Sequence, residues 1–349
     1  MKVDVVLEGG GVKGIALVGA LTALEEHGFE IHRVAGASAG AIVGALAAAG
    51  MDAKEMRDVV ASIDYSQFKD PGFLERLGLP GKGLSLLFEQ GIYEGRFLET
   101  WLTAQLAALG VSTFADLRDA DTDQGSATAD PKKSSKLVVT ASDISNGRLA
   151  YLPWDYQGHY PTSAEADGGM FERSVVEAVR CSMSIPFFYE PHRLKYRRQP
   201  TEKREVEAVM VDGGMLSNFP VQVFDRTDGR TPRWPTLGIK LSNRPEEMPP
   251  PKPVDGPIEF VQSLLTTMMG FSDRVHIENP KVISRTIFVD TLGVSATEFD
   301  RVSEDAKLRD DLFESGLWAA RKFLDGDGTP EHPKWTFERY VTEQAAPET

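Results

Sequence analysis

The chain has 349 residues, 41% of them hydrophobic and 26% charged, with a formal net charge of -14 at pH 7. This length and composition suffice for the core of one large α/β unit, or of two smaller ones, without disulfide or metal crosslinks. A chain this acidic is not expected to bind the phosphate backbone of a nucleic acid. The single cysteine, Cys181, excludes an intrachain disulfide and a zinc-type cluster, and it favours a reducing compartment.

The sequence shows neither a signal peptide nor a membrane span. Residues 1–4 run directly into a strand pattern, without the basic segment and long apolar stretch of a secretory signal. The most apolar window, residues 34–50, is interrupted by glycines and fits a strand, a tight turn and a buried helix. We therefore expect a cytoplasmic protein, and the sequence does not indicate its oligomeric state.

The order of the elements predicts a parallel sheet. A strand at residues 4–7 leads into a glycine loop and a helix at 15–27, and a strand at 31–35 leads into a tight turn and a helix to about 49. This order predicts a three-layer α/β/α fold with a mostly parallel central sheet and right-handed crossovers. The later elements that we expect are helices over much of 51–109 with a break at 80–83, a strand at 137–140, a helix at 171–183, a strand at 206–211, a helix at about 258–271, a strand at 282–290 and a helix at about 303–323.

Four segments differ in composition from this core. We expect one domain over residues 1–325 and a polar, loop-like C-terminal tail at 326–349. Within the domain, the polar residues 118–136 are typical of a mobile surface insertion and the proline-rich residues 245–257 of a linker segment. Residues 193–205 form a basic stretch that predicts a hairpin tip, which would either touch an anionic membrane surface transiently or simply be solvated.

A Gly-x-Ser-x-Gly sequence supplies a candidate nucleophile. Gly36, Ala37, Ser38, Ala39 and Gly40 lie between a predicted strand and a predicted helix. In that setting the sequence forms a nucleophile elbow, in which the serine is exposed on a sharp turn at a helix N-terminus that favours negative charge. The pattern is common by chance, and the flanking strand and helix are what favour the catalytic interpretation of Ser38.

The glycine loop after the first strand is a candidate oxyanion hole. It comprises Gly9, Gly10, Gly11, Val12, Lys13 and Gly14. Consecutive glycine amides can approach a developing oxyanion closely because no side chain blocks them. The same residues also spell the Gly-x-Gly-x-x-Gly dinucleotide fingerprint. That alternative requires an acidic residue after the second strand, and residues 31–50 contain none.

Asp212 is the candidate base. It lies with Gly213 and Gly214 at the end of an apolar strand, at the carboxyl edge where parallel sheets place reactive groups. A nucleophilic serine needs a base, which is usually a histidine. None of the six histidines lies at a strand end in a recognisable catalytic setting.

Taken together, the three motifs resemble those of the patatin-like phospholipases. The loop at 9–14 matches the family's glycine-rich oxyanion loop, residues 36–40 match its nucleophile elbow, and residues 212–214 match its catalytic Asp-Gly-Gly/Ala. Two weaker segments, 139–143 and 181–188, extend the resemblance over about residues 2–324. It implies a patatin-like fold, a Ser-Asp dyad of Ser38 and Asp212 without a catalytic histidine, hydrolysis of acyl esters in lipids or phospholipids, and no metal or cofactor.

Other functions remain open at this point. The same dyad would serve a thioesterase, a lysophospholipase or an acyltransferase, and product analysis separates these from one another. A non-catalytic module that binds an anion or a lipid would have no physical need for both Ser38 and Asp212. Headgroup, acyl-chain length, position of the cleaved ester and any activating partner are not indicated by the sequence.

Overall fold

The computed structural model describes residues 1–69, 93–119, 134–162, 169–199, 202–241, 279–329 and 333–345, with the isolated residues 254, 256, 260, 263 and 267. The expected break at 80–83, most of the insertion at 118–136 and nearly all of 245–271 therefore lie outside the described residues. None of the helices in the described ranges is both long and apolar enough to cross a membrane.

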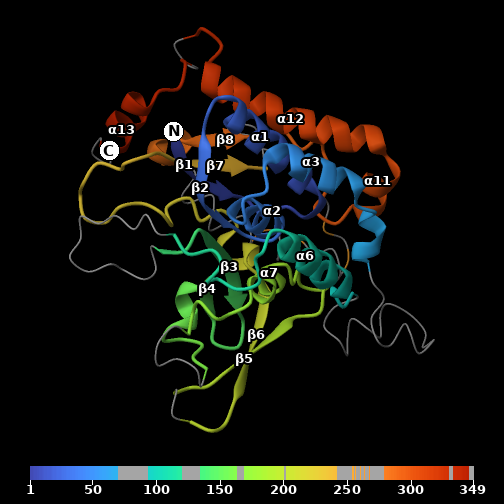
Figure 1. The fold of residues 1–349 in the computed structure, drawn as a ribbon. Coiled ribbons are helices and arrows are strands. Elements are labelled where there is room, and N and C mark those ends of the chain that lie inside the picture. The colour runs from blue at the N-terminus through green and yellow to red at the C-terminus, as the bar shows by residue number, and fades with distance from the viewer. Residues whose placement is uncertain are drawn as a thin grey trace.

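A single mixed sheet forms the centre of the molecule (Figure 1). Its strands are β1 (Lys2–Leu7), β2 (Glu30–Gly36), β3 (Leu137–Asp143), β4 (Arg148–Leu152), β5 (His192–Tyr196), β6 (Val206–Asp212), β7 (Thr236–Lys240) and β8 (Thr286–Phe288). The order is β5-β6-β3-β2-β1-β7-β8, with β4 paired to β3. The pairs from β3 through β2, β1 and β7 to β8 are parallel, whereas β4 and β6 pair antiparallel with β3, and β5 pairs antiparallel with β6.

Helices and loops cover both faces of this sheet, so the fold has three α/β/α layers. The longer helices are α1 (Gly14–Glu26), α2 (Ala39–Ala48), α3 (Ala53–Ser62), α6 (Arg96–Ala108), α7 (Val175–Ser182) and α12 (Ala306–Asp325). Helices α1, α2 and α7 pack on one face, and α12 lies against α1 on the outside (Figure 1). Short helices, α8 (Gly214–Ser217) and α10 (Pro280–Ile283), and the apolar segment 219–224 cover the other face.

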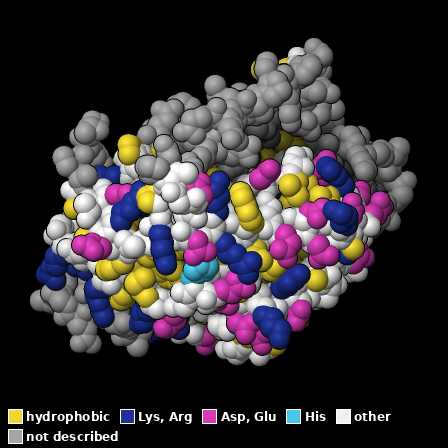
Figure 2. Space-filling model, turned by 90° about the horizontal axis from the view of Figure 1, so that it is seen from above, with side chains coloured by type: hydrophobic (Ala, Val, Ile, Leu, Met, Phe, Trp, Pro, Cys, Tyr) yellow, Lys and Arg dark blue, Asp and Glu magenta, His cyan; other side chains and the backbone are white. Residues whose placement is uncertain are grey.

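The alternation of side chains along the strands determines which layer each contacts. Val5 and Leu7 belong to the cluster that includes α1 and α2, whereas Val6, between them, packs with Phe219 on the opposite face. This is the two-residue period of a strand, and both faces are apolar because both are covered. The surface above α12 carries interspersed acidic and basic side chains (Figure 2), as expected for a solvated helix face.

Several element boundaries differ from the sequence prediction. The expected strand at 282–290 begins instead as α10, because Asn279 caps a helical turn with Pro280 in its first position, and only Thr286–Phe288 form a strand. The expected last helix is divided at Asp305, which caps α12 after the short α11 (Phe299–Glu304).

The C-terminal tail is not loop-like throughout. It contains helix α13 (Phe337–Ala345), in which Tyr340 is buried. The tail is anchored by aromatic contacts, since the Trp335 ring meets Phe29 edge-on at 5.5 Å and the Tyr340 hydroxyl accepts the Thr236 amide at 3.1 Å. Its polar composition concealed these few anchoring side chains.

Candidate functional site

The turn between β2 and α2 holds Ser38 in a strained backbone conformation. Ser38 has φ 51° and ψ -123°, in the region that residues with a Cβ seldom adopt. The flanking glycines are required by close packing, because a Cβ on Gly36 would lie 2.4 Å from the Gly40 carbonyl oxygen. A Cβ on Gly40 would lie 2.4 Å from the carbonyl oxygen of Leu7. The turn therefore has the geometry of a nucleophile elbow, with Ser38 as the N-cap of α2.

Strand register brings Ser38 and Asp212 to the same level of the sheet. In the parallel pair, Gly36 lies opposite Val139, so Ser38, two residues further on, reaches the level of Ala141. In the antiparallel pair, Asp212 lies opposite Ala141. The expectation that Asp212 ends a parallel strand is therefore wrong, because β6 runs against β3. The strand enters from beyond the carboxyl edge and ends at the level of the elbow.

The end of helix α7 connects the two residues through hydrogen bonds. The Ser38 amide donates to the Ser182 hydroxyl at 2.8 Å, and the Gly213 amide donates to the Ser182 carbonyl at 3.3 Å. The Asp212 amide donates to the Ser184 carbonyl at 2.9 Å. Ser182 and Ser184 are both fully buried. Both serines lie in the segment 181–188, where the sequence alone indicates no role for them.

Buried Arg180 in turn holds Ser184. Its guanidinium donates to the Ser184 hydroxyl at 2.6 Å and to the carbonyl oxygens of Glu94 and Glu190 at 2.7 and 2.9 Å. The guanidinium also pairs with the Glu99 carboxylate at 3.3 Å, so this buried arginine fixes the α7 exit against the surrounding loops and α6. The position of the Asp212 backbone therefore depends on side chains well outside the three sequence motifs.

Asp212 is a buried carboxylate with one oxygen that has no hydrogen-bond partner. Its Oδ1 accepts the Gly214 amide at 2.8 Å, whereas Oδ2 has no partner within hydrogen-bond geometry among the described residues. Burial raises the pKa of Asp212 to about 6, and the Ser38 hydroxyl and the Gly214 amide partly oppose this rise. The Ser38 Oγ itself is directed at the Met183 sulfur, 3.5 Å away. The carboxylate thus lies near Ser38 with a free acceptor.

Hydrogen bonding divides the six residues of the glycine loop into two groups. The Gly9 amide donates to the Asn218 carbonyl, the Val12 amide to the Ala296 carbonyl, the Lys13 amide to the Gly10 carbonyl and the Gly14 amide to the Gly11 carbonyl. The amides of Gly10 and Gly11 have no acceptor among the described residues. Only these two members of the predicted oxyanion loop therefore remain available to a bound oxyanion.

Neighbouring residues that the sequence analysis did not select hold this loop. Asn218 accepts the Gly9 amide through its carbonyl, and its side-chain amide donates to the Gly9 carbonyl at 3.1 Å. Gly11 has φ 55°, and a Cβ there would lie 1.9 Å from the Ala296 carbonyl oxygen, so the loop tolerates no side chain. No sequence motif marks Asn218 or Ala296 as a neighbour of the loop, because the fold brings each of them from more than 200 residues away.

A buried ion pair lies at the base of the loop. Glu8 pairs with the Lys240 ammonium, and its second oxygen accepts the Leu241 amide at 2.5 Å. Burial lowers the pKa of Lys13, an effect that Glu8 opposes and Lys240 reinforces. Two lysines and one glutamate therefore lie at this loop.

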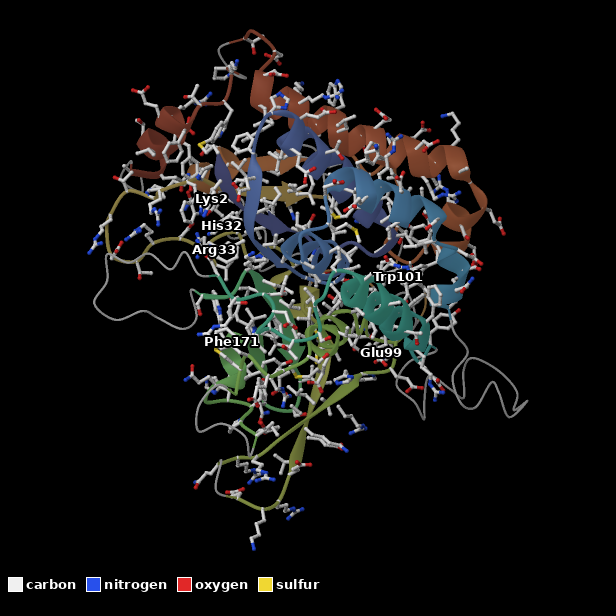
Figure 3. The ribbon with its side chains drawn as sticks, viewed as in Figure 1. Lys2, His32, Arg33, Glu99, Trp101 and Phe171 are labelled. Carbon is white, nitrogen blue, oxygen red and sulfur yellow. The ribbon has the colours of Figure 1, made fainter. Side chains whose placement is uncertain are left out.

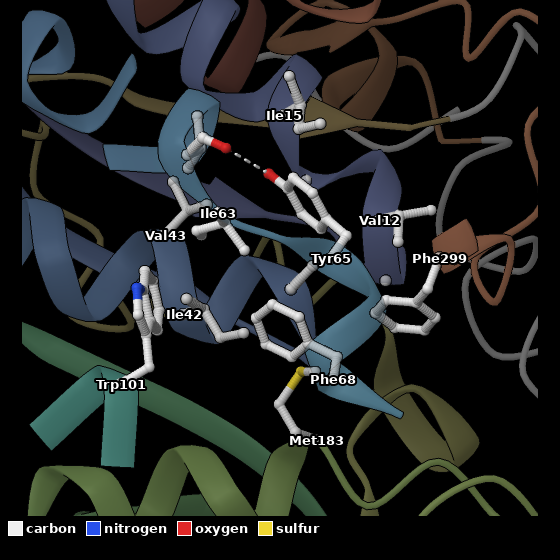
Figure 4. A pocket seen from close by; sticks show the side chains of 14 residues that line it. Val12, Ile15, Ile42, Val43, Ile63, Tyr65, Phe68, Trp101, Met183 and Phe299 are labelled. Carbon is white, nitrogen blue, oxygen red and sulfur yellow. Dashed lines mark hydrogen bonds between the residues drawn. The ribbon is translucent and has the colours of Figure 1, made fainter. Parts of the chain in front are cut away.

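An apolar pocket opens beside Ser38 (Figure 4). It encloses about 470 Å³ of empty space when its open mouth is counted. Gly11, Ala39 and Met183 line it on the side of the elbow. The remaining lining residues are Val12, Gly14, Ile15, Ile42, Val43, Val60, Ile63, Tyr65, Phe68, Trp101 and Phe299.

The pocket wall is almost free of polar groups. The Tyr65 hydroxyl is directed away and donates to the Val60 carbonyl at 3.0 Å, as the dashed line in Figure 4 shows. Trp101 comes from α6, the helix that also carries Glu99 (Figure 3), and its ring meets Phe68 edge-on at 6.3 Å. Of the described aromatic residues in the segment 65–109, Tyr65, Phe68 and Trp101 thus form part of the wall, whereas residues 70–92 lie outside the description.

The described histidines lie beside other carboxylates. His27 pairs with Asp325, His32 with Asp119, His159 with Asp155 and His192 with Glu177, while His276 and His332 lie outside the described residues. None of the four is joined to Ser38 or Asp212 by a hydrogen bond or an ion pair. Within the described ranges, no group of three His, Cys, Asp or Glu side chains is arranged to hold a metal ion.

Comparison with known proteins finds a matching family and a similar protein sequence. A family described as patatin-like phospholipase matches residues 5–225, a range that contains all three motifs. The chain is also 36% identical over 327 residues to YqhO of Bacillus subtilis (strain 168), which is described as uncharacterized; the alignment covers 93% of this chain and 98% of YqhO.

Comparison with solved structures gives matches at low sequence identity. VipD from Legionella pneumophila superposes with a TM-score of 0.51 at 17% identity, over 92% of this chain and 66% of VipD. ExoU, in its complex with SpcU from Pseudomonas aeruginosa, gives a TM-score of 0.42 at 20% identity, over 92% of this chain and 52% of ExoU. The chain thus spans about two thirds of the first of these proteins and about half of the second, and the likeness to VipD concerns the fold alone.

Proposed function

Because the chain belongs to the patatin-like phospholipase family, we propose that it is a lipid acyl hydrolase in which Ser38 is the nucleophile and Asp212 the only general base. The observation that carries this proposal is the position of Ser38. It is held at φ 51° on an elbow, directly before the pocket-lining residue Ala39 and near a buried carboxylate with one oxygen that has no hydrogen-bond partner among the described residues. A cleft with these elements fits acyl transfer.

The reaction follows from the atoms in place. The Asp212 carboxylate accepts the proton of the Ser38 hydroxyl as Oγ attacks the ester carbonyl carbon. The amides of Gly10 and Gly11, and the N-terminus of α2, donate to the oxyanion of the tetrahedral intermediate. The intermediate collapses as protonated Asp212 returns its proton to the leaving alcohol oxygen. Water then attacks the acyl-enzyme with Asp212 again as base, and Asp212 returns the proton to Ser38 Oγ as the fatty acid leaves.

The raised pKa of Asp212 suits this role. A carboxylate with a pKa of about 6 is ionised at neutral pH and is still a stronger base than an ordinary aspartate. The described histidines lie beside other carboxylates, away from Ser38 and Asp212, which supports a dyad rather than a triad.

The apolar pocket is assigned to the acyl chain. Its wall begins at Gly11, Ala39 and Met183, so a chain bound there would place its carbonyl carbon near Ser38 Oγ. Replacing Ile42 by Phe fills part of the pocket. We expect kcat/KM for a long-chain nitrophenyl ester to fall at least about tenfold relative to the acetyl ester. An unchanged ratio would place the acyl chain elsewhere.

The experiment that tests the proposal compares three proteins: wild type, Ser38→Ala and Asp212→Asn. Hydrolysis of a soluble nitrophenyl ester and release of fatty acid from phospholipid vesicles are measured for each. We expect both variants to lose at least about 100-fold in rate. Full activity of Ser38→Ala would show that the nucleophile is wrong. A wild type that is folded, inactive and not labelled at Ser38 by a fluorophosphonate would indicate a binding module.

The same assays separate hydrolysis from acyl transfer. A thioesterase would prefer an acyl thioester, and an acyltransferase would pass the acyl group to an added alcohol faster than to water. No feature of the described residues favours either over hydrolysis, and the product mixture decides among the three.

A further inference from the structure

Two exposed apolar side chains lie in turn positions that disfavour them. Phe187 has φ 65° and is 42% exposed, and Leu292 has φ 54° and is 40% exposed. Among the described residues, Ser38 is the only other non-glycine residue with positive φ. Backbone strain of this kind persists where the surrounding structure enforces it, and it collects at functional sites.

Both residues occupy glycine-type positions of β-turns. In the turn 185–188 the Phe188 amide donates to the Ile185 carbonyl at 3.0 Å, so Pro186 and Phe187 are its central residues. Proline followed by a residue with positive φ is the pattern of a type II turn, whose third position normally takes glycine or asparagine. Phenylalanine is therefore an unfavourable occupant of this position.

The second turn repeats the pattern. The Val294 amide donates to the Thr291 carbonyl at 2.9 Å, and both central residues, Leu292 and Gly293, have positive φ. That is the pattern of a type I′ turn, in which glycine, asparagine and aspartate dominate. At both turns, the chain thus holds a large apolar side chain in solvent at a cost in backbone strain.

Both turns border the apolar pocket. The first follows Met183, which lines the pocket, and ends at Phe188, whose ring stacks on the lining residue Phe299 with centroids 5.2 Å apart. The second precedes Ala296, whose carbonyl oxygen accepts the Val12 amide beside Gly11. The Phe188–Phe299 stack joins the two segments. Phe187 and Leu292 are therefore exposed on the two turns that flank the site.

We propose that Phe187 and Leu292 form an apolar rim that docks the pocket onto a lipid–water interface. This inference rests on the proposed function, since an enzyme for acyl esters in lipids must take its substrate from an aggregate. Two side chains are far too few for a stable protein interface, which buries about 800 Å² on each partner. They suffice to enter the edge of a bilayer, which needs no matching shape.

The rim is apolar rather than basic. The Asp290 carboxylate accepts the Leu292 amide at 2.8 Å, so an acidic group lies directly beside the second turn. The attraction should therefore not depend on anionic lipids or on low salt, in contrast to that of a basic surface. Vesicles of zwitterionic phosphatidylcholine are the probe that suits this chemistry.

Asparagine substitutions test the rim without endangering the fold. Asparagine tolerates positive φ better than Phe or Leu does, so Phe187→Asn and Leu292→Asn remove the apolar side chains and relieve strain. Binding to phosphatidylcholine vesicles is measured by co-sedimentation in a Ser38→Ala background, where hydrolysis does not alter the vesicles. We expect binding roughly 5-fold weaker for each substitution and about 30-fold weaker for both, with the unfolding free energy not reduced.

Trp318→Gln is the matched control. Trp318 is 64% exposed on α12, so its substitution removes a larger exposed apolar side chain from another surface. We expect vesicle binding to be unchanged by it. Equal losses for Trp318→Gln and the rim variants would overturn the proposal, as would vesicle binding that the double rim variant leaves intact, or wild-type binding that disappears in high salt.

The design separates this inference from the proposed function. Vesicle binding in the Ser38→Ala background does not require catalysis, so it tests the rim even if the chemistry is assigned wrongly. With Ser38 intact, the ratio of vesicle hydrolysis to soluble-ester hydrolysis should fall about 30-fold in the double variant. An intact ratio would refute the rim while leaving the dyad in place.

Discussion

Replacing Asp212 by Asn should abolish activity and make the protein more stable. The carboxylate is fully buried, its Oδ2 lacks a partner among the described residues, and burial raises its pKa from 3.8 to about 6. A rise of this size corresponds to about 3 kcal/mol of unfavourable free energy for the ionised form in the folded state. Asn keeps the oxygen that accepts the Gly214 amide and removes the charge.

The pH dependence of the gain in stability is the sharper part of this prediction. Below about pH 3.8 Asp212 is protonated in both folded and unfolded chains, and the two proteins should unfold with equal free energy. Between about pH 4 and 6 the unfolded wild type ionises first, so the wild type loses stability relative to Asp212→Asn. Above about pH 7 the difference should level at about 3 kcal/mol in favour of the variant. Urea unfolding at several pH values measures it.

Asp143 provides the matched control. It is also fully buried, but its carboxylate accepts hydrogen bonds from the Ser145 and Asn146 amides, the Asn146 side chain and the Tyr160 hydroxyl. Asp143→Asn replaces one carboxylate oxygen by an NH₂ group, which would face other hydrogen-bond donors, and it should therefore destabilise the protein at pH 7. If Asp212→Asn is equally destabilising, or if its effect does not vary with pH, the unpaired buried charge inferred for Asp212 is wrong.

Three further predictions concern catalysis. For wild type, kcat/KM on a soluble ester should fall about tenfold per pH unit below about pH 6 and be flat above pH 6, because Asp212 must be ionised to accept a proton. A pH profile without this break would exclude Asp212 as the base. Ser182→Ala leaves the buried Ser38 amide without its acceptor, so kcat should fall roughly 10-fold with KM little changed. An unaltered kcat would show that Ser182 does not position the elbow. Gly11→Ala should lower kcat at least about 100-fold. Gly28 also has a positive φ but lies in open space, so Gly28→Ala should retain activity. Equal activity of the two variants would contradict the assignment of the glycine loop.

Much of the fold could be predicted from the amino-terminal sequence because local rules act strongly there. Apolar strands at 4–7 and 31–35, each followed by glycines and a helix, allow few arrangements other than parallel strands with crossovers. The elbow at 36–40 was predictable for the same reason, since a serine between two glycines after a strand has little freedom.

The rest could not be predicted because it depends on register and distant contacts. The direction of β6 follows from its pairing with β3, which periodicity does not reveal. Asp212 was therefore expected at the edge of the sheet where it lies, but at the end of a parallel strand, whereas β6 is antiparallel to β3. The identity of the free amides in the glycine loop depends on Asn218 and Ala296, which the fold brings in from distant parts of the chain. Helix α13 was missed because Trp335 and Tyr340 anchor a segment that is otherwise polar.

The contrast between the two buried aspartates shows how a dyad can work without histidine. In a triad the histidine holds the transferred proton, and the carboxylate behind it can remain an ordinary, fully paired anion. In a dyad the carboxylate must hold the proton itself, so its pKa has to approach the working pH, and hydrogen-bond donors would lower that pKa. Asp143 has four such donors, whereas Asp212, level with the elbow, has one backbone donor, the nearby Ser38 hydroxyl, and an oxygen without a hydrogen-bond partner among the described residues. The missing partner of Asp212 is therefore what this chemistry requires, and the stability gained by Asp212→Asn would measure its cost.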